Sequence, residues 1–110
     1  MPPAPDTGDG EQPVPDIDRL VHEPARLMVM ANLYVVDSAD FMYLMRRTGL
    51  TFGNLSSHLS KLEAAGYVAI DKRFAGKKPR TMVRLTDKGR AALDAYRQSM
   101  ERVLDSLPVR

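Results

Sequence analysis

Apolar residues recur at spacings of three and four along the first half of the chain, which is the period of a helix with one buried face. The first stretch starts at Pro24, a residue suited to a first helical turn because its missing N–H costs nothing there. A second stretch follows the capping residue Asp40 and ends near Gly49, and a third runs from Thr51 to Gly66. The inward positions predicted for these helices are Leu27, Met30, Ala31, Leu33 and Tyr34, then Phe41, Leu44 and Met45, then Phe52, Leu55, Leu59 and Leu62.

A different pattern follows the third helix. Residues 67–73 and 81–86 predict two short strands, and the glycine and proline between them predict a hairpin loop over residues 74–80. Thr86 then caps a last long helix that runs to about Leu104. The order is helix, helix, helix, hairpin, long helix. We therefore expect a mainly α fold with a small β-hairpin (α+β), a winged helix-turn-helix.

The 110 residues allow one domain. Residues 1–16 are rich in proline, glycine and acids and predict a disordered acidic tail, so residues 17–106 should form the domain, including a C-terminal dimerisation helix. Residues 1–23 carry six acids and one base, whereas residues 24–110 carry fifteen bases and eight acids. A basic folded part indicates a polyanionic partner.

Composition excludes several other classes of protein. There is no cysteine, which excludes disulfides and cysteine-based metal sites. The sequence has no apolar stretch long enough for a membrane span or a secretory signal, so we expect a cytoplasmic protein. His22 and His58 lack the spacing of a metal site, and Ser57 and His58 are helix neighbours that point in different directions. We therefore expect no cofactor and no enzymatic activity.

Two short helices separated by Gly49 and Leu50 predict a helix-turn-helix, whose second helix enters the major groove of duplex DNA. The polar face of that helix, about residues 51–65, contains no acid before Glu63. Base-edge contacts are expected from Asn54 and His58, and phosphate contacts from hydroxyl groups and one lysine. The predicted recognition-helix residues are Thr51, Asn54, Ser56, Ser57, His58 and Lys61.

The hairpin is strongly basic. Between Lys72 and Arg90 there are eight bases and one acid. Basic side chains at a hairpin tip can reach flanking phosphates or the minor groove, where arginine is favoured. The predicted DNA-binding residues of this wing, about residues 74–80, are Arg73, Lys77, Lys78 and Arg80.

The last helix carries an apolar stripe that extends beyond the reach of so small a core, which predicts a homodimer interface. The residues of that interface are Leu93, Tyr96, Met100, Val103, Leu104 and Leu107. Methionines crowd the first two helices and are expected to fill the core, although a pocket there for an unidentified small-molecule effector is an alternative. A protein docking module without DNA binding is the alternative function, but such a surface should carry apolar anchors rather than a basic tip.

Residues 50–93, LTFGNLSSHLSKLEAAGYVAIDKRFAGKKPRTMVRLTDKGRAAL, resemble the winged-helix regulators of the MarR and ArsR type, especially small stand-alone domains related to MarR proteins. The resemblance extends over about residues 20–104. It implies a homodimeric repressor or activator that binds a pseudo-palindromic DNA site. Phe52 and Gly53 stand where the family often has polar residues. The cysteine metal sites of many ArsR proteins are absent, so metal sensing is not implied.

Overall fold

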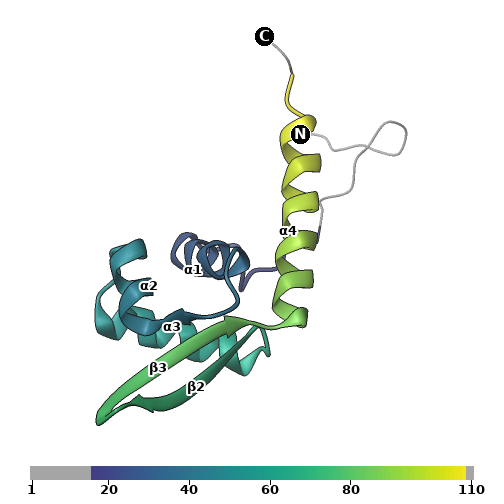
Figure 1. Cartoon of the computed structure of the whole chain (residues 1–110). Helices are drawn as coiled ribbons and strands as arrows, with labels where there is room; N and C mark the ends of the chain where they lie inside the picture. Colours follow the sequence, from purple (N-terminus) through teal and green to yellow (C-terminus); the bar gives the residue numbers. More distant parts are fainter. Residues whose placement is uncertain (1–15, 109–110) are drawn as a thin grey trace.

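The structure, a computed structural model, describes residues 16–108, so all but the last residue of the predicted acidic tail lies outside the described residues. Within them the chain forms four helices and three strands (Figure 1). Their bounds are α1 Pro24–Tyr34, β1 Ala39–Asp40, α2 Phe41–Thr48, α3 Phe52–Ala64, β2 Val68–Ala75, β3 Lys78–Leu85 and α4 Asp87–Asp105. The predicted winged-helix fold class is confirmed. No helix in this part of the chain is long and apolar enough to cross a bilayer.

The helix boundaries are set by local caps. The side chain of Thr51 accepts a hydrogen bond from the Asn54 N–H at 3.1 Å and begins α3. The left-handed Gly49, with φ of 73°, ends α2. Glu23 caps α1 by accepting a hydrogen bond from the Arg26 N–H at 2.8 Å, and this bond lowers the pKa of the Glu23 carboxyl. Because each cap satisfies backbone groups within its own turn, these boundaries could be predicted from sequence.

The core lies between α1, α2, α3 and the sheet, where the largest fully buried side chains are Met30, Leu33, Leu44, Leu55, Leu59 and Leu62. The predictions for Ala31 and Phe52 were wrong, since both are exposed. Val29, not Ala31, is the buried neighbour on α1. Phe52, the first residue of α3, is 64% exposed because it lies beyond the edge of the core.

The three strands form one antiparallel sheet in the order β1-β3-β2. The sequence did not predict β1, whose two residues pair with Met82 and Val83 of β3. The predicted loop over residues 74–80 was also too long, because pairing continues to Ala75 and Lys78. Gly76, with φ of 66°, supplies the left-handed position that a two-residue hairpin turn needs. The wing is therefore a hairpin paired up to its tip.

Helix α4 packs on the rest of the fold through its N-terminal half, where Leu93 and Tyr96 contact the core and the Tyr96 hydroxyl lies 2.8 Å from Nδ1 of His22. A Cβ atom on Gly89 would lie 2.1 Å from the carbonyl oxygen of Tyr67, so glycine is required for the first turn of α4 to pack on the start of β2. The hydroxyl of Tyr67 donates a hydrogen bond to the Asp18 carboxylate, which raises the pKa of Tyr67 to about 12 and ties the segment before α1 to the sheet. Beyond this anchor, the C-terminal half of α4 projects away from the other elements (Figure 1).

Candidate nucleic-acid interface

The outward face of α3 is polar and uncharged except for one lysine. Leu55, Leu59 and Leu62 bury the opposite face of the helix in the core. The exposed residues on the outward face are Gly53, Asn54, Ser57, Ser60 and Lys61. Short hydrogen-bonding side chains let a helix backbone approach another surface closely while still offering donors and acceptors to it. This face therefore has the chemistry that a major groove requires.

Three of the predicted recognition-helix residues do not lie freely on this outward face. His58 is half-buried on the α1 side, with its Nδ1 atom 3.3 Å from Nη1 of Arg26, so the prediction that it points outward was wrong. One residue along a helix turns the side chain by about 100°, which carries His58 from the outer face toward α1. Ser56 is half-buried and faces the sheet, and the exposed Thr51 is partly engaged as the cap of α3.

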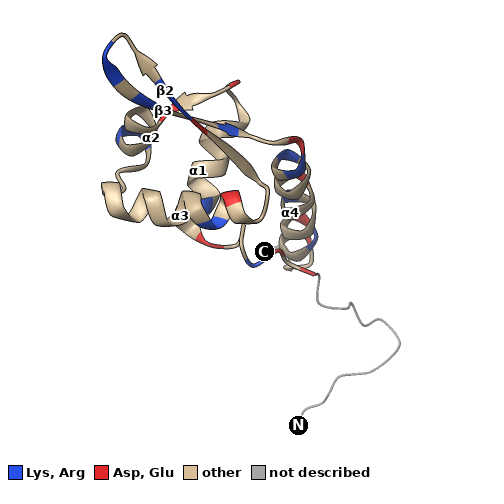
Figure 2. Ribbon diagram, turned by 90° about the horizontal axis from the view of Figure 1, so that it is seen from below, with Lys and Arg blue, Asp and Glu red and all other residues tan. Residues whose placement is uncertain are grey.

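The cations of the wing cluster near its tip, as Figure 2 shows in blue. Lys77 and Lys78 are exposed, and no carboxylate of residues 16–108 forms a salt bridge with either. Arg80 instead pairs with Asp40, at 3.3 Å between Nε and Oδ2, and Arg73 pairs with Asp71, at 3.1 Å between Nε and Oδ2. Exposed pairs of this kind contribute little to stability, so both arginines can exchange a carboxylate for a phosphate.

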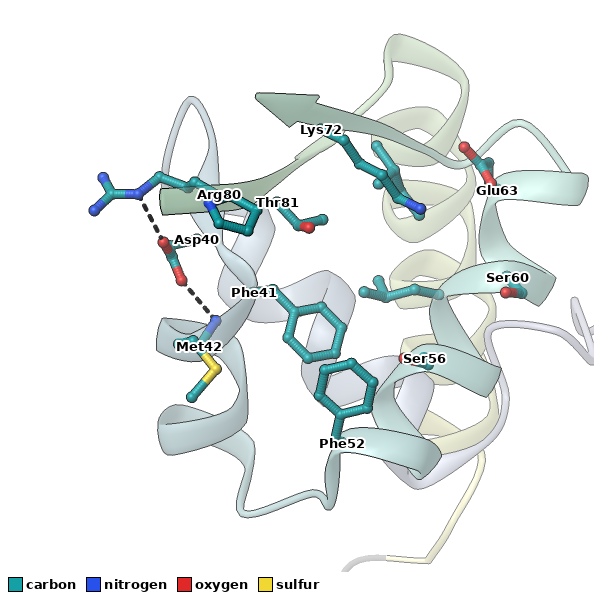
Figure 3. Close-up of a pocket in the computed structure, with 13 residues that line it drawn as sticks. Asp40, Phe41, Met42, Phe52, Ser56, Ser60, Glu63, Lys72, Arg80 and Thr81 are labelled. Carbon is teal, nitrogen blue, oxygen red and sulfur yellow. Dashed lines mark hydrogen bonds and ion pairs between the residues drawn. The ribbon is translucent and has the colours of Figure 1, made fainter. Parts of the chain in front are cut away.

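A groove of about 740 Å³ separates α3 from the sheet (Figure 3). Ser56, Ser60 and Glu63 of α3 line one wall, and Lys72 and Arg80 of the sheet line the other. The ring of Phe52 lies at the α3 end of the groove, beside α2. The hydroxyl groups on one side and the cations on the other can contact a sugar-phosphate strand between the helix and the wing, whereas the Glu63 carboxylate would repel a phosphate placed beside it.

A second groove, of about 520 Å³, lies between α1 and α4. Four of the predicted interface residues line it from α4, namely Leu93, Tyr96, Met100 and Leu104. Leu27, Ala31 and Tyr34 line it from α1. Val103 is half-buried and Leu107 is 59% exposed, and both lie outside the lining of this groove. The groove is mainly apolar and extends along the projecting part of α4.

Sequence reasoning missed Arg46 and Arg47, two exposed cations in the last turn of α2. The first helix of a helix-turn-helix crosses the DNA backbone, so cations on α2 lie on an element suited to phosphate contact. The signal in the sequence was an adjacent pair of arginines before Gly49. Among residues 16–108, no group of three or more His, Cys, Asp or Glu side chains could hold a metal ion.

Comparisons with known proteins agree on one architecture. Residues 25–104 match the family described as winged helix DNA-binding domain. An uncharacterized protein of Methanocaldococcus jannaschii is 35% identical over 78 residues, which are 71% of this chain and 85% of that protein. The transcriptional regulator homologue protein of Pyrococcus horikoshii has a solved structure with a TM-score of 0.78 and 34% identity, over 83% of this chain and 90% of that one.

A more distant solved structure contains DNA. Overoxidized AbfR bound to DNA gives a TM-score of 0.68 at 18% identity, over 80% of this chain and 67% of AbfR. At that identity the likeness concerns the fold alone. The matched proteins therefore share the arrangement seen here, with a helix-turn-helix, a paired wing and a long last helix. The chain belongs to the winged helix DNA-binding domain family, so the winged-helix part of the resemblance is confirmed, and the chain is similar to a protein described as a transcriptional regulator homologue.

Proposed function

We propose that this protein is a transcriptional regulator that binds a specific duplex DNA site, with α3 in the major groove and the wing on the flanking phosphates or in the minor groove. The observation that carries the proposal is the acid-free outward face of α3 beside a wing whose Lys77 and Lys78 are free of carboxylate partners within the described residues.

The proposed contacts divide by chemistry. Asn54 and Ser57 lie on the outward face of α3 and are the candidates for base-edge hydrogen bonds. Thr51, Lys61 and the groove-lining Ser56 are the candidates for phosphate contacts on the helix side. The wing contributes Arg73, Lys77, Lys78 and Arg80. His58 is better suited to position α3 through its contact with Arg26 than to touch a base.

We further propose that the protein is a homodimer that buries the groove between α1 and α4. Leu104 near the end of α4 is 58% exposed, and Leu107, just beyond the helix, is 59% exposed, so the apolar stripe of α4 continues onto an uncovered surface. A second copy of the chain would cover this stripe and give two-fold symmetry. Two recognition helices would then face half-sites about one helical turn apart in a pseudo-palindromic site.

A salt series with random duplex DNA tests the proposed function. Each protomer offers Lys61 and the wing cations Arg73, Lys77, Lys78 and Arg80 to DNA, so a dimer would neutralise about ten phosphates. The logarithm of the binding constant should then fall against the logarithm of the salt concentration with a slope of about −9. Fluorescence anisotropy from low to high salt measures this slope. Failure to bind duplex DNA at low salt would refute the proposal and favour a protein docking module instead.

Gly53 provides a test of close approach by α3. A Cβ atom there would meet nothing within 4 Å, so the fold does not require glycine at this exposed helix position. Gly53→Ala should stabilise the protein by about 0.5–1 kcal/mol through helix propensity. If the start of α3 lies against base edges, the added methyl group should nevertheless weaken specific binding by roughly tenfold, or about 1.4 kcal/mol. Thermal unfolding and binding titrations measure the two effects, and unchanged binding would contradict close approach.

A further inference from the structure

Phe52 is an exposed aromatic residue at the start of the recognition helix. It is the first residue of α3, directly after the cap Thr51, and its side chain is 64% exposed. Single exposed apolar side chains are common and need no explanation by themselves. Phe52 differs because its ring is supported: its centroid lies 4.9 Å from that of Phe41, with the two rings tilted by 52° (Figure 3).

The support for Phe52 comes from the core. Phe41 is the first residue of α2, is only 9% exposed, and packs in the core cluster. A tilted aromatic pair at this separation is attractive. One face of the Phe52 ring is therefore held against a fixed neighbour, while the remainder stays open to solvent. An apolar group is thus presented in a defined position at the N-terminal end of α3, at the groove that the apolar Met42 and the polar Ser56 also line.

The chemistry of that position narrows what the ring can recognise. Residues near the N-terminus of a recognition helix are those that reach base edges. In the major groove, each base pair presents its own pattern of hydrogen-bond donors and acceptors. Thymine also presents a C5-methyl group there, and apolar side chains such as phenylalanine can contact that methyl group. We propose that Phe52 contacts the C5-methyl group of a thymine and so selects thymine at one position of each half-site.

This inference rests on the proposed function, because it requires α3 to lie in the major groove. The other exposed phenylalanine, Phe74, is 72% exposed on the wing and lies opposite Pro79 in the sheet. It is the matched control, because it is equally apolar but does not belong to the recognition helix.

The first test changes the DNA and leaves the protein unchanged. A binding site is first selected from random duplexes with the full chain, and each thymine of one half-site is then replaced in turn by deoxyuridine. This replacement deletes the C5-methyl group and keeps every hydrogen-bonding group of the base. The replacement at one position should lower the affinity of the wild-type protein about fourfold, which is the effect expected when the burial of one methyl group is lost.

Protein variants then identify the partner of that methyl group. Phe52→Ala should remove the sensitivity to deoxyuridine at that one position, whereas Phe74→Ala should leave it in place. Circular dichroism verifies that each variant is folded, and the wild-type measurement with altered DNA does not depend on either variant. The inference is overturned if no deoxyuridine position weakens wild-type binding, or if Phe52→Ala keeps the same sensitive position. Absence of any duplex binding would overturn the proposed function as well, so the two failures are distinguishable.

Discussion

Replacing Lys77 and Lys78 together by glutamate should lower the affinity for duplex DNA by roughly 100-fold or more at moderate salt, because phosphate contacts are lost and repulsion replaces them. Both side chains are exposed, Lys77 in the two-residue turn of the wing and Lys78 at the start of β3. Neither makes a salt bridge within the described part of the chain, so the substitution removes no intramolecular ion pair. The fold should therefore be retained, and the loss should appear in binding alone.

The slope of the salt dependence separates this effect from a general change of charge. A dimer that loses four of about ten phosphate contacts should show a slope of about −5 instead of about −9. Arg19→Glu combined with Arg102→Glu is the control, since it changes the net charge equally through exposed residues outside the wing and α3. Affinity and slope measured together by anisotropy decide the result. A Lys77→Glu, Lys78→Glu variant that binds like the wild type would show that the wing does not contact DNA.

Much of this fold could be predicted from sequence because its signals are local. Thr51 and Thr86 cap helices that begin at the next residue, and Gly49 ends α2 in the left-handed conformation. The features that were missed depend on contacts between distant segments. Strand β1 exists only because two residues pair with β3, and Val21 is fully buried because its segment is tied to the sheet through Asp18 and Tyr67.

The candidate site divides in the same way. Helical periodicity correctly separated the buried leucines of α3 from Asn54, Ser57 and Lys61. It could not show that His58 turns toward Arg26, because that depends on where α1 packs. It also placed Phe52 in the core, since an apolar residue in phase with buried leucines has the same pattern whether or not the core extends that far. The sequence thus predicts which face of a helix is buried more reliably than it predicts how far along the helix the core extends.

The proposed dimer leads to the second large effect. Leu104→Glu should convert the dimer to a monomer, because it places a charge in an apolar interface that α4 and α1 would otherwise bury. Leu104 is 58% exposed in the isolated chain, so the substitution should cost the folded monomer little. Arg102→Gln is the control. It changes the net charge by the same amount two residues earlier, on a different side of α4.

Loss of the dimer should have a large effect on DNA binding although no DNA-contacting residue is changed. Two linked recognition helices bind a pseudo-palindromic site with an avidity that can exceed single-site affinity by about 10²–10⁴-fold, and a monomer forfeits this gain. Sedimentation at micromolar concentration should give a dimer for the wild type and for Arg102→Gln and a monomer for Leu104→Glu, with binding of the full site reduced accordingly. If the wild type sediments as a monomer, or Leu104→Glu remains a dimer, then α4 does not form the interface, and the exposed stripe of Leu104 and Leu107 must serve another partner.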